Sequence, residues 1–458
     1  MRLQNLECLI RLTHPGAVVY AETIEHLEER GFFVKRESGI LLHPSSLGGF
    51  AGAKRWIDFL ADAGVSVWQI LPLGPVGLGN SPYQSPSAWA GEPSLATPCY
   101  DETGLDDFVA HESGWLPDYA LFMALRERFG APWQTWDEPL RMRDRDTLER
   151  YHKELAVPIR AICREQMHFF RQWNAIHAYA NSRGVEILGD LPIYVAEDSV
   201  DVWCNPWLFR KDAVAGCPPD GFCADGQLWG NPLYDWNKLK ETGYDWWLWR
   251  LRHTLRMVDR VRIDHFRAFD AYWAVPKSAP TARDGHWEDG PGLSFFRAVW
   301  SALGDVSIVA EDLGFLTPRV HALRESAGLP GMLVLQFAWS QGSAYLPHNH
   351  RENAVVYTGT HDNDTTRGWA DSHPDEAAFA RSYLGCEDIL DGMLRAAWRS
   401  PARLAVAPMQ DFLGLGSEAR MNTPGTVGGN WDWQMNLDAL TPALAAHIRV
   451  MNELYERN

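Results

Sequence analysis

Short hydrophobic runs that end in polar or charged residues recur along this chain, and segments with helical spacing of hydrophobic residues separate most of them. Each run is typical of a short buried strand. The eight predicted strands are 39–44, 65–73, 185–190, 260–266, 306–312, 331–337, 355–362 and 404–411. The predicted helices are 51–63, 156–182, 245–257, 292–303, 319–327, 375–384 and 388–400. Strands and helices in this alternation predict an α/β fold, a (β/α)8 TIM barrel.

Two connections between predicted strands are too long for a plain barrel, and both are rich in Gly, Pro, Trp and Asn. Residues 74–155 are predicted to form an inserted subdomain, and residues 194–245 a lid, both over the C-terminal face of the barrel. Residues 38–458 would then form one catalytic unit. Residues 1–37 are predicted to be an N-terminal extension with a weak helical stretch at 22–30, to which the pattern assigns no role.

The chain has 458 residues and a formal net charge of −17, with acidic residues spread along it rather than gathered in a tail. An acidic chain without a basic stripe argues against nucleic acid and anionic membranes as partners. No run reaches the roughly 18 apolar residues of a membrane span, and the N-terminus lacks a secretory signal pattern. We therefore expect a cytoplasmic protein with a neutral substrate.

The cysteines do not form a metal-binding pattern. Cys217 and Cys223 are close in sequence, but no further Cys or His completes a zinc set. Tryptophan, by contrast, is abundant, with 22 residues, many of them beside Gly, Asn, Asp or Pro. Aromatic rings in polar loops suit hydroxyl-rich ligands such as sugars, although several of these rings are expected to be ordinary core or loop anchors.

Ionisable side chains stand at the ends of several predicted strands, where TIM-barrel enzymes carry catalytic groups. They are Asp190, Asp264, Glu311, His361, Asp362 and Asp411. Arg262 shares a strand face with Asp264, and its charge favours the ionised carboxylate. Glu311 follows a hydrophobic run, where desolvation would raise its pKa. Singly, Asp264 and Glu311 could equally be structural ion-pairing groups, but Asp264, Glu311 and Asp362 on three different strands favour an active site.

An ionised Asp264 beside a protonated Glu311 fits the two carboxyl groups of a retaining glycosidic mechanism, one a nucleophile and one a proton donor. The polar run around His361 and Asp362 supports this interpretation, because packing alone does not explain so many polar groups after a buried strand. The chemistry predicted from the residues is therefore cleavage of a glycosidic bond.

Several motifs of the chain, in the same order, resemble those of the amylomaltases, which are 4-α-glucanotransferases related to the α-amylase superfamily. The most specific are RIDHFR at 262–267, AEDLG at 310–314 and TGTHDND at 358–364. The other matching segments are 38–44, 68–75, 81–85, 189–193, 226–232 and 418–422, so that the similarity runs from about residue 38 to about residue 435.

The resemblance implies an enzyme that cleaves an α-1,4 bond of a maltooligosaccharide or of a starch- or glycogen-type glucan and holds the glucan covalently. The glucan is then transferred to the 4-hydroxyl of an acceptor glucose or maltooligosaccharide, without metal or cofactor. The resemblance implies Asp264 as nucleophile, Glu311 as general acid/base and Asp362 as the acid that stabilises the transition state. The residues that it places at the substrate are Ser81, Tyr83, Asp190, Asp220, Phe222, Gln227, Trp229, Asn231, Arg262 and His361.

The chain also departs from the family pattern. The segment between about 95 and 115 is shorter than the family's, and Gly221 stands where an aromatic residue is usual, which leaves Phe222 as the aromatic side chain of the lid. Glu92 replaces the usual Asn and Gln434 the usual Arg. Two alternatives stay open: a hydrolase that uses the same carboxylates, and a catalytically inactive glucan-binding protein.

Overall fold

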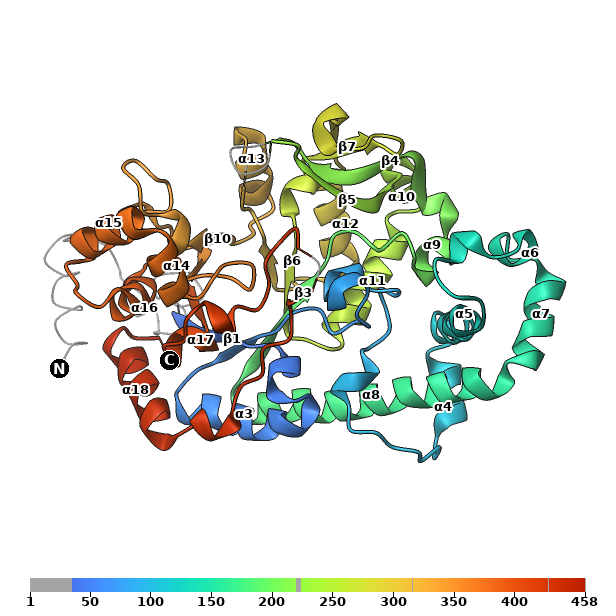
Figure 1. The fold of residues 1–458 in the computed structure, drawn as a ribbon, viewed down its shortest axis with the longest axis horizontal. Helices are drawn as coiled ribbons and strands as arrows, with labels where there is room; N and C mark the ends of the chain where they lie inside the picture. Colours follow the sequence, from blue (N-terminus) through green and yellow to red (C-terminus); the bar gives the residue numbers. More distant parts are fainter. Residues whose placement is uncertain (1–34, 220–223, 315, 427, 458) are drawn as a thin grey trace, which may run out of the picture. The chain divides into compact units, whose positions relative to one another are not determined.

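Eight parallel strands form the central sheet of the computed structural model (Figure 1). Their order is β10-β11-β12-β1-β2-β3-β6-β9, so the chain passes once around a nearly closed barrel. At the seam between β9 and β10, the Ala310 amide donates to the Pro330 carbonyl at 2.9 Å. The strands are β1 (Glu37–Leu41), β2 (Val67–Gln69), β3 (Glu186–Leu191), β6 (Arg260–Ile263), β9 (Ile308–Ala310), β10 (Gly331–Val334), β11 (Ala354–Tyr357) and β12 (Leu404–Pro408). The predicted (β/α)8 barrel is confirmed.

The seven predicted helices are present, and their ends differ from the predicted ones by at most two residues. The helices between barrel strands and after the last one are α3 (Ala53–Asp62), α8 (Ala156–Ser182), α11 (Asp245–Leu255), α12 (Leu293–Leu303), α13 (Pro318–Ser326), α14 (Thr366–Ser372), α15 (Pro374–Leu384), α16 (Ile389–Arg399), α17 (Met409–Phe412) and α18 (Pro442–Leu454). The structure describes residues 35–219, 224–314, 316–426 and 428–457. The predicted helix at 22–30 lies outside this range, as do the lid residues Asp220, Gly221 and Phe222.

Alternate residues of the barrel strands face two different hydrophobic clusters. Leu188 of β3, Val309 of β9 and Val355 of β11 belong to one cluster, to which nearly every barrel strand contributes, so this cluster fills the barrel interior. Their sequence neighbours, such as Ile187 and Ile308, belong to the cluster that also contains the helices. This alternation decides which polar side chains point into the barrel.

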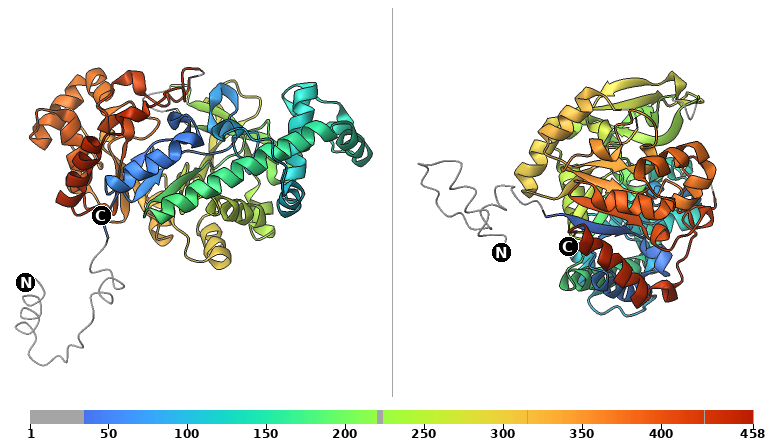
Figure 2. Two further views of the ribbon diagram at one scale, coloured as in Figure 1. Left: turned by 90° about the horizontal axis from the view of Figure 1, so that it is seen from below. Right: turned by 90° about the vertical axis from the view of Figure 1, so that its left-hand side faces the viewer.

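The first insertion consists of short helices that α8 connects back to the barrel. They are α4 (Leu105–His111), α5 (Leu116–Phe129), α6 (Glu138–Arg141) and α7 (Arg145–Glu154). Helix α8 has 27 residues and is therefore about 40 Å long. It runs from the insertion to the N-terminal end of β3, as Figure 2 shows from below. Phe169 and Trp173, on the face of α8 toward the core, are almost completely buried.

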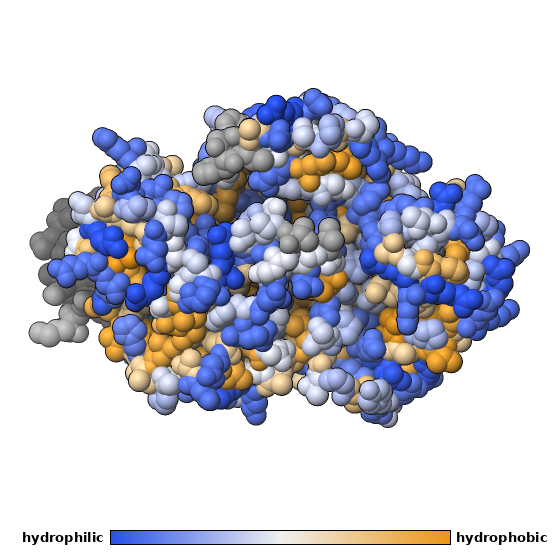
Figure 3. All heavy atoms as spheres, in the orientation of Figure 1, coloured by the Kyte–Doolittle hydropathy of each residue, from blue (hydrophilic) through white to orange (hydrophobic). Residues whose placement is uncertain are grey.

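A second, antiparallel sheet has the strand order β5-β4-β7-β8. It contains β4 (Phe209–Cys217), β5 (Gln227–Tyr234), β7 (Ala271–Pro276) and β8 (His286–Asp289). In the chain, α9 (Val200–Cys204) precedes β4, and α10 (Trp236–Glu241) follows β5. Strands β4 and β5 lie within the lid predicted at 194–245. No strand is predicted for them or for 271–289, where β8 is short and mostly polar. In the space-filling view, hydrophobic atoms gather over the region where Figure 1 draws this sheet (Figure 3). The boundaries of the subdomain and of the lid stay predictions.

Candidate active site

Three neighbouring strands, β3, β6 and β9, carry the predicted carboxylates at their C-terminal ends. Strand register pairs Asp190 with Arg262, and Arg262 with Val309, so all three side chains face the barrel interior. Asp264 follows two residues after Arg262, and Glu311 two residues after Val309, on the same side of their strands. Because Ile263 and Ala310 are register partners, Asp264 and Glu311 stand at one level of adjacent strands.

Arg262 connects two carboxylates. Its Nη1 donates to both oxygens of Asp190, at 2.7 and 2.6 Å, and its Nη2 donates to Oδ1 of Asp264 at 3.1 Å. The Asp190 side chain is fully buried, the Arg262 side chain is 4% exposed, and the Asp264 side chain is 28% exposed. Asp264 is therefore the member of this group that can meet a ligand.

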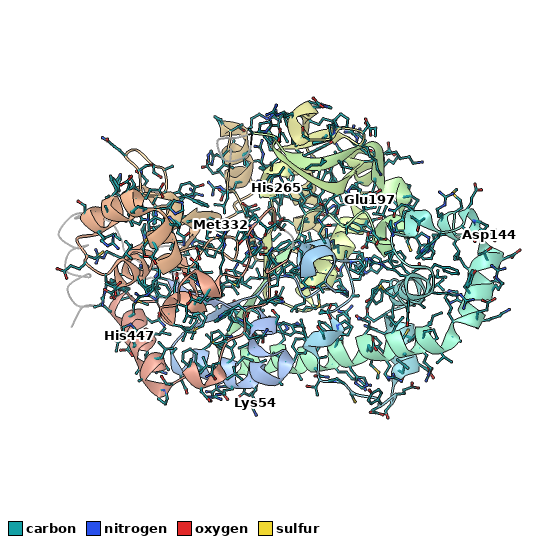
Figure 4. The ribbon with its side chains drawn as sticks, viewed as in Figure 1. Lys54, Asp144, Glu197, His265, Met332 and His447 are labelled. Carbon is teal, nitrogen blue, oxygen red and sulfur yellow. The ribbon has the colours of Figure 1, made fainter. Side chains whose placement is uncertain are left out.

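Glu311 accepts hydrogen bonds from two backbone amides. The amide of His265 donates to Oε2 at 2.7 Å, and the amide of Leu313 donates to Oε1 at 3.0 Å. His265, which follows β6 and is labelled in Figure 4, adopts the left-handed conformation with φ 48°. This turn, unusual for a residue other than glycine, directs the His265 amide at the carboxylate of the next strand.

Burial raises the pKa of Glu311 to about 8; the Arg262 cation opposes the rise and the Asp264 charge adds to it. Burial also raises the pKa of Asp264 to about 7, against the opposing charge of Arg262, while Asp190 and Asp362 add to the rise. The expectation that Arg262 favours an ionised Asp264 has the right sign. However, Arg262 is shared with Asp190, so burial has the larger effect on Asp264. Burial thus shifts both carboxyl groups toward their protonated forms.

A chain of hydrogen bonds joins His361 to this cluster. The hydroxyl of Tyr83 donates to Oδ2 of Asp190 at 2.6 Å, because the carboxylate can only accept. The hydroxyl oxygen of Tyr83 also lies 2.9 Å from Nε2 of His361. Because the Tyr83 proton points to Asp190, Nε2 must carry a proton and donate it to this oxygen. Burial lowers the pKa of His361 and so favours its neutral form. The hydrogen-bond chain His361–Tyr83–Asp190–Arg262–Asp264 thus reaches the carboxylate of Asp264 through Arg262.

Asp362 is fixed by residues that the site prediction did not name. Nδ2 of Asn422 donates to its Oδ1 at 2.6 Å, and Nη2 of Arg420 donates to its backbone carbonyl at 2.7 Å. Its side chain stays 44% exposed. Both partners lie in the matching segment 418–422, which is the signal that could have identified them.

Aromatic rings surround these groups. Tyr83 stacks on His361, with centroids 5.5 Å apart at 11°, and Trp431 lies 6.1 Å from Tyr83 and 5.8 Å from His361. Trp229 meets His265 edge-on at 4.8 Å. Trp431, in one of the tryptophan-rich loops, was not among the predicted site residues. These rings give the site faces on which sugar rings can stack.

Several predicted substrate residues have their side chains engaged in holding loops. Oγ of Ser81 accepts from the Tyr83 amide, and Nδ2 of the buried Asn231 donates to the Val195 carbonyl at 2.9 Å. Oε1 of the exposed Gln227 accepts from Nε1 of Trp229. Their roles at the substrate stay predictions, and Asp220 and Phe222 lie outside the described residues.

Two further acids at strand ends are structural. Asp411 is 1% exposed and accepts from Thr358 and twice from Thr366. Asp312 is 2% exposed and lies between Arg324 and Arg351. The sequence pattern alone did not separate these acids from Glu311. Among the described residues, no group of three His, Cys, Asp or Glu side chains is arranged to hold a metal ion.

A protein-family model described as 4-alpha-glucanotransferase matches residues 42–100 and 96–440 of the chain. The chain belongs to the 4-alpha-glucanotransferase family. It is 45% identical to a 4-alpha-glucanotransferase of Synechocystis over 496 residues, with 92% of this chain and 98% of the relative covered. It is 42% identical to that of Thermus thermophilus over 495 residues, with 92% and 99% covered.

Solved structures agree with this assignment. The amylomaltase of Streptococcus agalactiae in complex with acarbose superimposes with a TM-score of 0.88 at 35% identity, over 93% of this chain and all of that one. The amylomaltase of Corynebacterium glutamicum shares the fold at 20% identity, with a TM-score of 0.71 over 92% of this chain and 74% of that one. The protein is thus a transferase that acts on α-glucans.

The alignments with the relatives are longer than the part of this chain that they cover. The alignment with the Synechocystis enzyme covers 92% of the 458 residues but extends over 496 positions, so about 75 positions have no counterpart here. The two ranges that match the family model overlap at 96–100, at the start of the segment that is predicted to be short.

No helix within the described residues is long and apolar enough to cross a membrane.

Proposed function

We propose that this 4-alpha-glucanotransferase works by retaining double displacement, with Asp264 as the nucleophile and Glu311 as the general acid/base. The observation that carries the proposal is the placement of these carboxyl groups at one level of adjacent strands. Neighbouring strands run about 4.8 Å apart, and the carboxyl groups of retaining enzymes stand about 5–5.5 Å apart. The raised pKa of Glu311, about 8, supports its role as proton donor. The hydrogen bond from the Arg262 cation, which favours the ionised carboxylate, supports Asp264 as the nucleophile.

In the first step, Asp264 attacks the anomeric carbon of the donor while Glu311 gives its proton to the departing glycosidic oxygen. The bond from Arg262 at 3.1 Å leaves one oxygen of Asp264 to attack. Loss of its proton leaves Glu311 anionic, and the His265 and Leu313 amides stabilise that charge.

In the second step, Glu311 removes a proton from the 4-hydroxyl of the acceptor, whose oxygen displaces Asp264 from the anomeric carbon. The third acid of the site, Asp362, is held by a hydrogen bond of 2.6 Å from Nδ2 of Asn422. It is placed to accept from sugar hydroxyls and to stabilise the positive charge of the oxocarbenium-like transition state. The net stereochemistry at the anomeric carbon is retention.

The donors we propose are maltooligosaccharides and starch- or glycogen-type glucans, and the acceptors glucose and maltooligosaccharides. Tyr83, Trp229 and Trp431 offer the sugar-stacking faces for both. Hydrolysis by the same residues is the competing outcome, because water can replace the acceptor when the acceptor subsites are empty.

The test is incubation of the purified protein with maltotriose alone, with products separated and glucose measured over time. A ladder of longer oligosaccharides and glucose at constant total reducing ends is expected for transfer. A rise in total reducing ends without longer products would show hydrolysis instead of transfer. Unchanged maltotriose would show that it is not a donor for this enzyme. Glu311→Gln, given a donor with an activated leaving group, should accumulate a glycosyl-enzyme that mass spectrometry locates on Asp264.

A further inference from the structure

A partly exposed hydrophobic strip crosses one face of the antiparallel sheet. Strand register aligns Leu228 of β5 with Gly216 of β4, Gly216 with Trp273 of β7, and Trp273 with Trp287 of β8. Register partners share a face of a sheet, so the side chains form one row. Leu228 is 44% exposed and Trp287 is 39% exposed. We call Leu228, Trp273 and Trp287 the aromatic strip.

The two rings of the aromatic strip are held in place. The guanidinium of Arg267 lies 3.8 Å from the centroid of the Trp287 ring. Trp273 meets Trp287 at 5.1 Å and 68°, and its Nε1 donates to the Ala282 carbonyl at 2.8 Å. Rings fixed in this way lose little conformational entropy when a ligand stacks on them. At Gly216, a Cβ would come within 2.5 Å of the Gln227 carbonyl, so the row has no side chain between Leu228 and Trp273.

One end of the aromatic strip contacts the segment that carries Asp264. Arg267, which supports Trp287, lies on the 3-10 helix Phe266–Phe269, three residues after Asp264. At the other end, Leu228 precedes Trp229, whose ring meets His265 at 4.8 Å, and successive residues of a strand face opposite sides of a sheet. The strip therefore lies on the reverse face of the strand that carries Trp229, and its Trp287 end is joined to the catalytic segment through Arg267.

We propose that the aromatic strip is an accessory binding surface for a long α-glucan chain whose end lies in the catalytic site, with Trp287 as its main platform. The inference rests on the proposed function. Three cross-strand spacings of about 4.8 Å make the strip about 14 Å long, which suits an extended ligand of several sugar units. A protein partner is a poorer fit, because one leucine and two tryptophans expose far less than the roughly 800 Å² that each partner of a stable interface buries.

A strip outside the catalytic site predicts an effect that depends on the length of the donor. A long glucan can reach both the carboxylates and the strip, whereas maltotriose fills only the sites nearest the cleaved bond. Loss of Trp287 should therefore raise KM for amylose and leave kcat for amylose, and both constants for maltotriose, unchanged.

The experiment compares Trp287→Ala with the parent enzyme on amylose and on maltotriose. We expect KM for amylose to rise about three- to tenfold, the size of one aromatic stacking contact. The matched control is Trp207→Ala, because Trp207 is similarly exposed, at 46%, but lies on the 3-10 helix Pro206–Leu208 outside the strip. Trp287→Phe should restore most of the affinity. Equal losses on both donors, or an unchanged KM for amylose, would overturn the proposal.

A binding measurement separates this inference from the proposed function. Retardation in a native gel containing amylose is compared for Asp264→Asn and for Asp264→Asn combined with Trp287→Ala. Weaker retardation of the double variant is expected even if the parent enzyme fails to disproportionate maltotriose, while equal retardation would reject the strip as a glucan surface. If Trp287→Ala does not fold, Leu228→Ser at the other end of the strip replaces it.

Discussion

Two arginines of β6, two residues apart and on the same face of the strand, each bridge two carboxylates. At the N-terminal end of the barrel, Arg260 donates to both oxygens of Glu37, at 2.7 and 2.8 Å, and to Glu186. At the C-terminal end, Arg262 bridges Asp190 and Asp264. The side chain of Arg260 is 19% exposed and that of Glu186 48%, whereas Arg262 is 4% exposed and Asp190 fully buried.

The comparison shows that the ion-pair pattern alone does not make an active site. Desolvation with incomplete compensation raises the pKa of Asp264 to about 7, because the Arg262 cation also serves the fully buried Asp190. It also leaves an oxygen of Asp264 free to react. At the N-terminal end, water also solvates the partly exposed carboxylates of Glu37 and Glu186. The ion pairs of Arg260 with these two residues link strands β1, β3 and β6. In TIM barrels the C-terminal face carries the chemistry and the N-terminal face contributes stability.

The largest difference is expected when one carboxylate at each end loses its charge. Asp264→Asn should lower kcat by roughly 10⁴-fold or more, because the amide cannot form the covalent intermediate, with little change in thermal unfolding. Glu37→Gln should instead keep kcat within about twofold and lower the free energy of unfolding by about 1 kcal/mol. Maltotriose assays and urea unfolding of both variants measure this; a fully active Asp264→Asn enzyme would remove the nucleophile assignment.

Replacement of each arginine sharpens the comparison. Arg262→Met leaves the buried Asp190 carboxylate without its cation, so a loss of about 3–5 kcal/mol in stability is expected together with loss of transfer. Arg262→Lys keeps a charge but not the two-nitrogen bridge, and should fold with kcat reduced roughly 10²-fold. The corresponding Arg260→Lys should change kcat little. If both lysine variants lost activity equally, the distinction between the two ends would fail.

The pH dependence tests the protonation assigned to Glu311. Because Glu311 must donate a proton, kcat for transfer should fall as the pH rises through about 8. In Glu311→Gln with an activated donor, this alkaline limb should disappear. The folded pKa lies above the usual value near 4.5, so the stability associated with the Glu311 proton is present at low pH and lost as the pH rises through about 8. Glu311→Gln should therefore unfold at a higher temperature than the parent at pH 9, and at a similar temperature at pH 5.

The barrel, and the position of Asp264 and Glu311 at its strand ends, were predictable because their signals are local: short hydrophobic runs, and acids that directly follow them. The sheet of β7 and β8 was not, since the polar strand His286–Asp289 is stabilised by pairing with β7 rather than by its own pattern. The sequence also did not reveal that Asp190 and Tyr83 are partners, because the two residues lie 107 positions apart. The hydrophobic pattern put Asp411 beside Glu311 among the strand-end groups, and only the family resemblance left it out of the catalytic residues. The structure shows Asp411 buried against Thr358 and Thr366.

The smallest expected effect concerns Tyr83, which links His361 to the cluster at the C-terminal end. Tyr83→Phe keeps the ring that stacks on His361 at 5.5 Å and removes the hydroxyl that donates to Asp190 at 2.6 Å. Asp190 keeps both bonds from Arg262, so its charge stays compensated, and one lost hydrogen bond predicts a fall in kcat of about tenfold. KM for maltotriose should change less than kcat, since the stacking face is intact. Tyr234→Phe is the control: its hydroxyl donates to the Ile193 carbonyl in the core next to β3, and its removal should lower the unfolding temperature without changing the rate. A Tyr83→Phe enzyme with an unchanged kcat would mean that Arg262 alone orients Asp264, and that the hydrogen-bond chain from His361 stabilises the fold rather than the reaction.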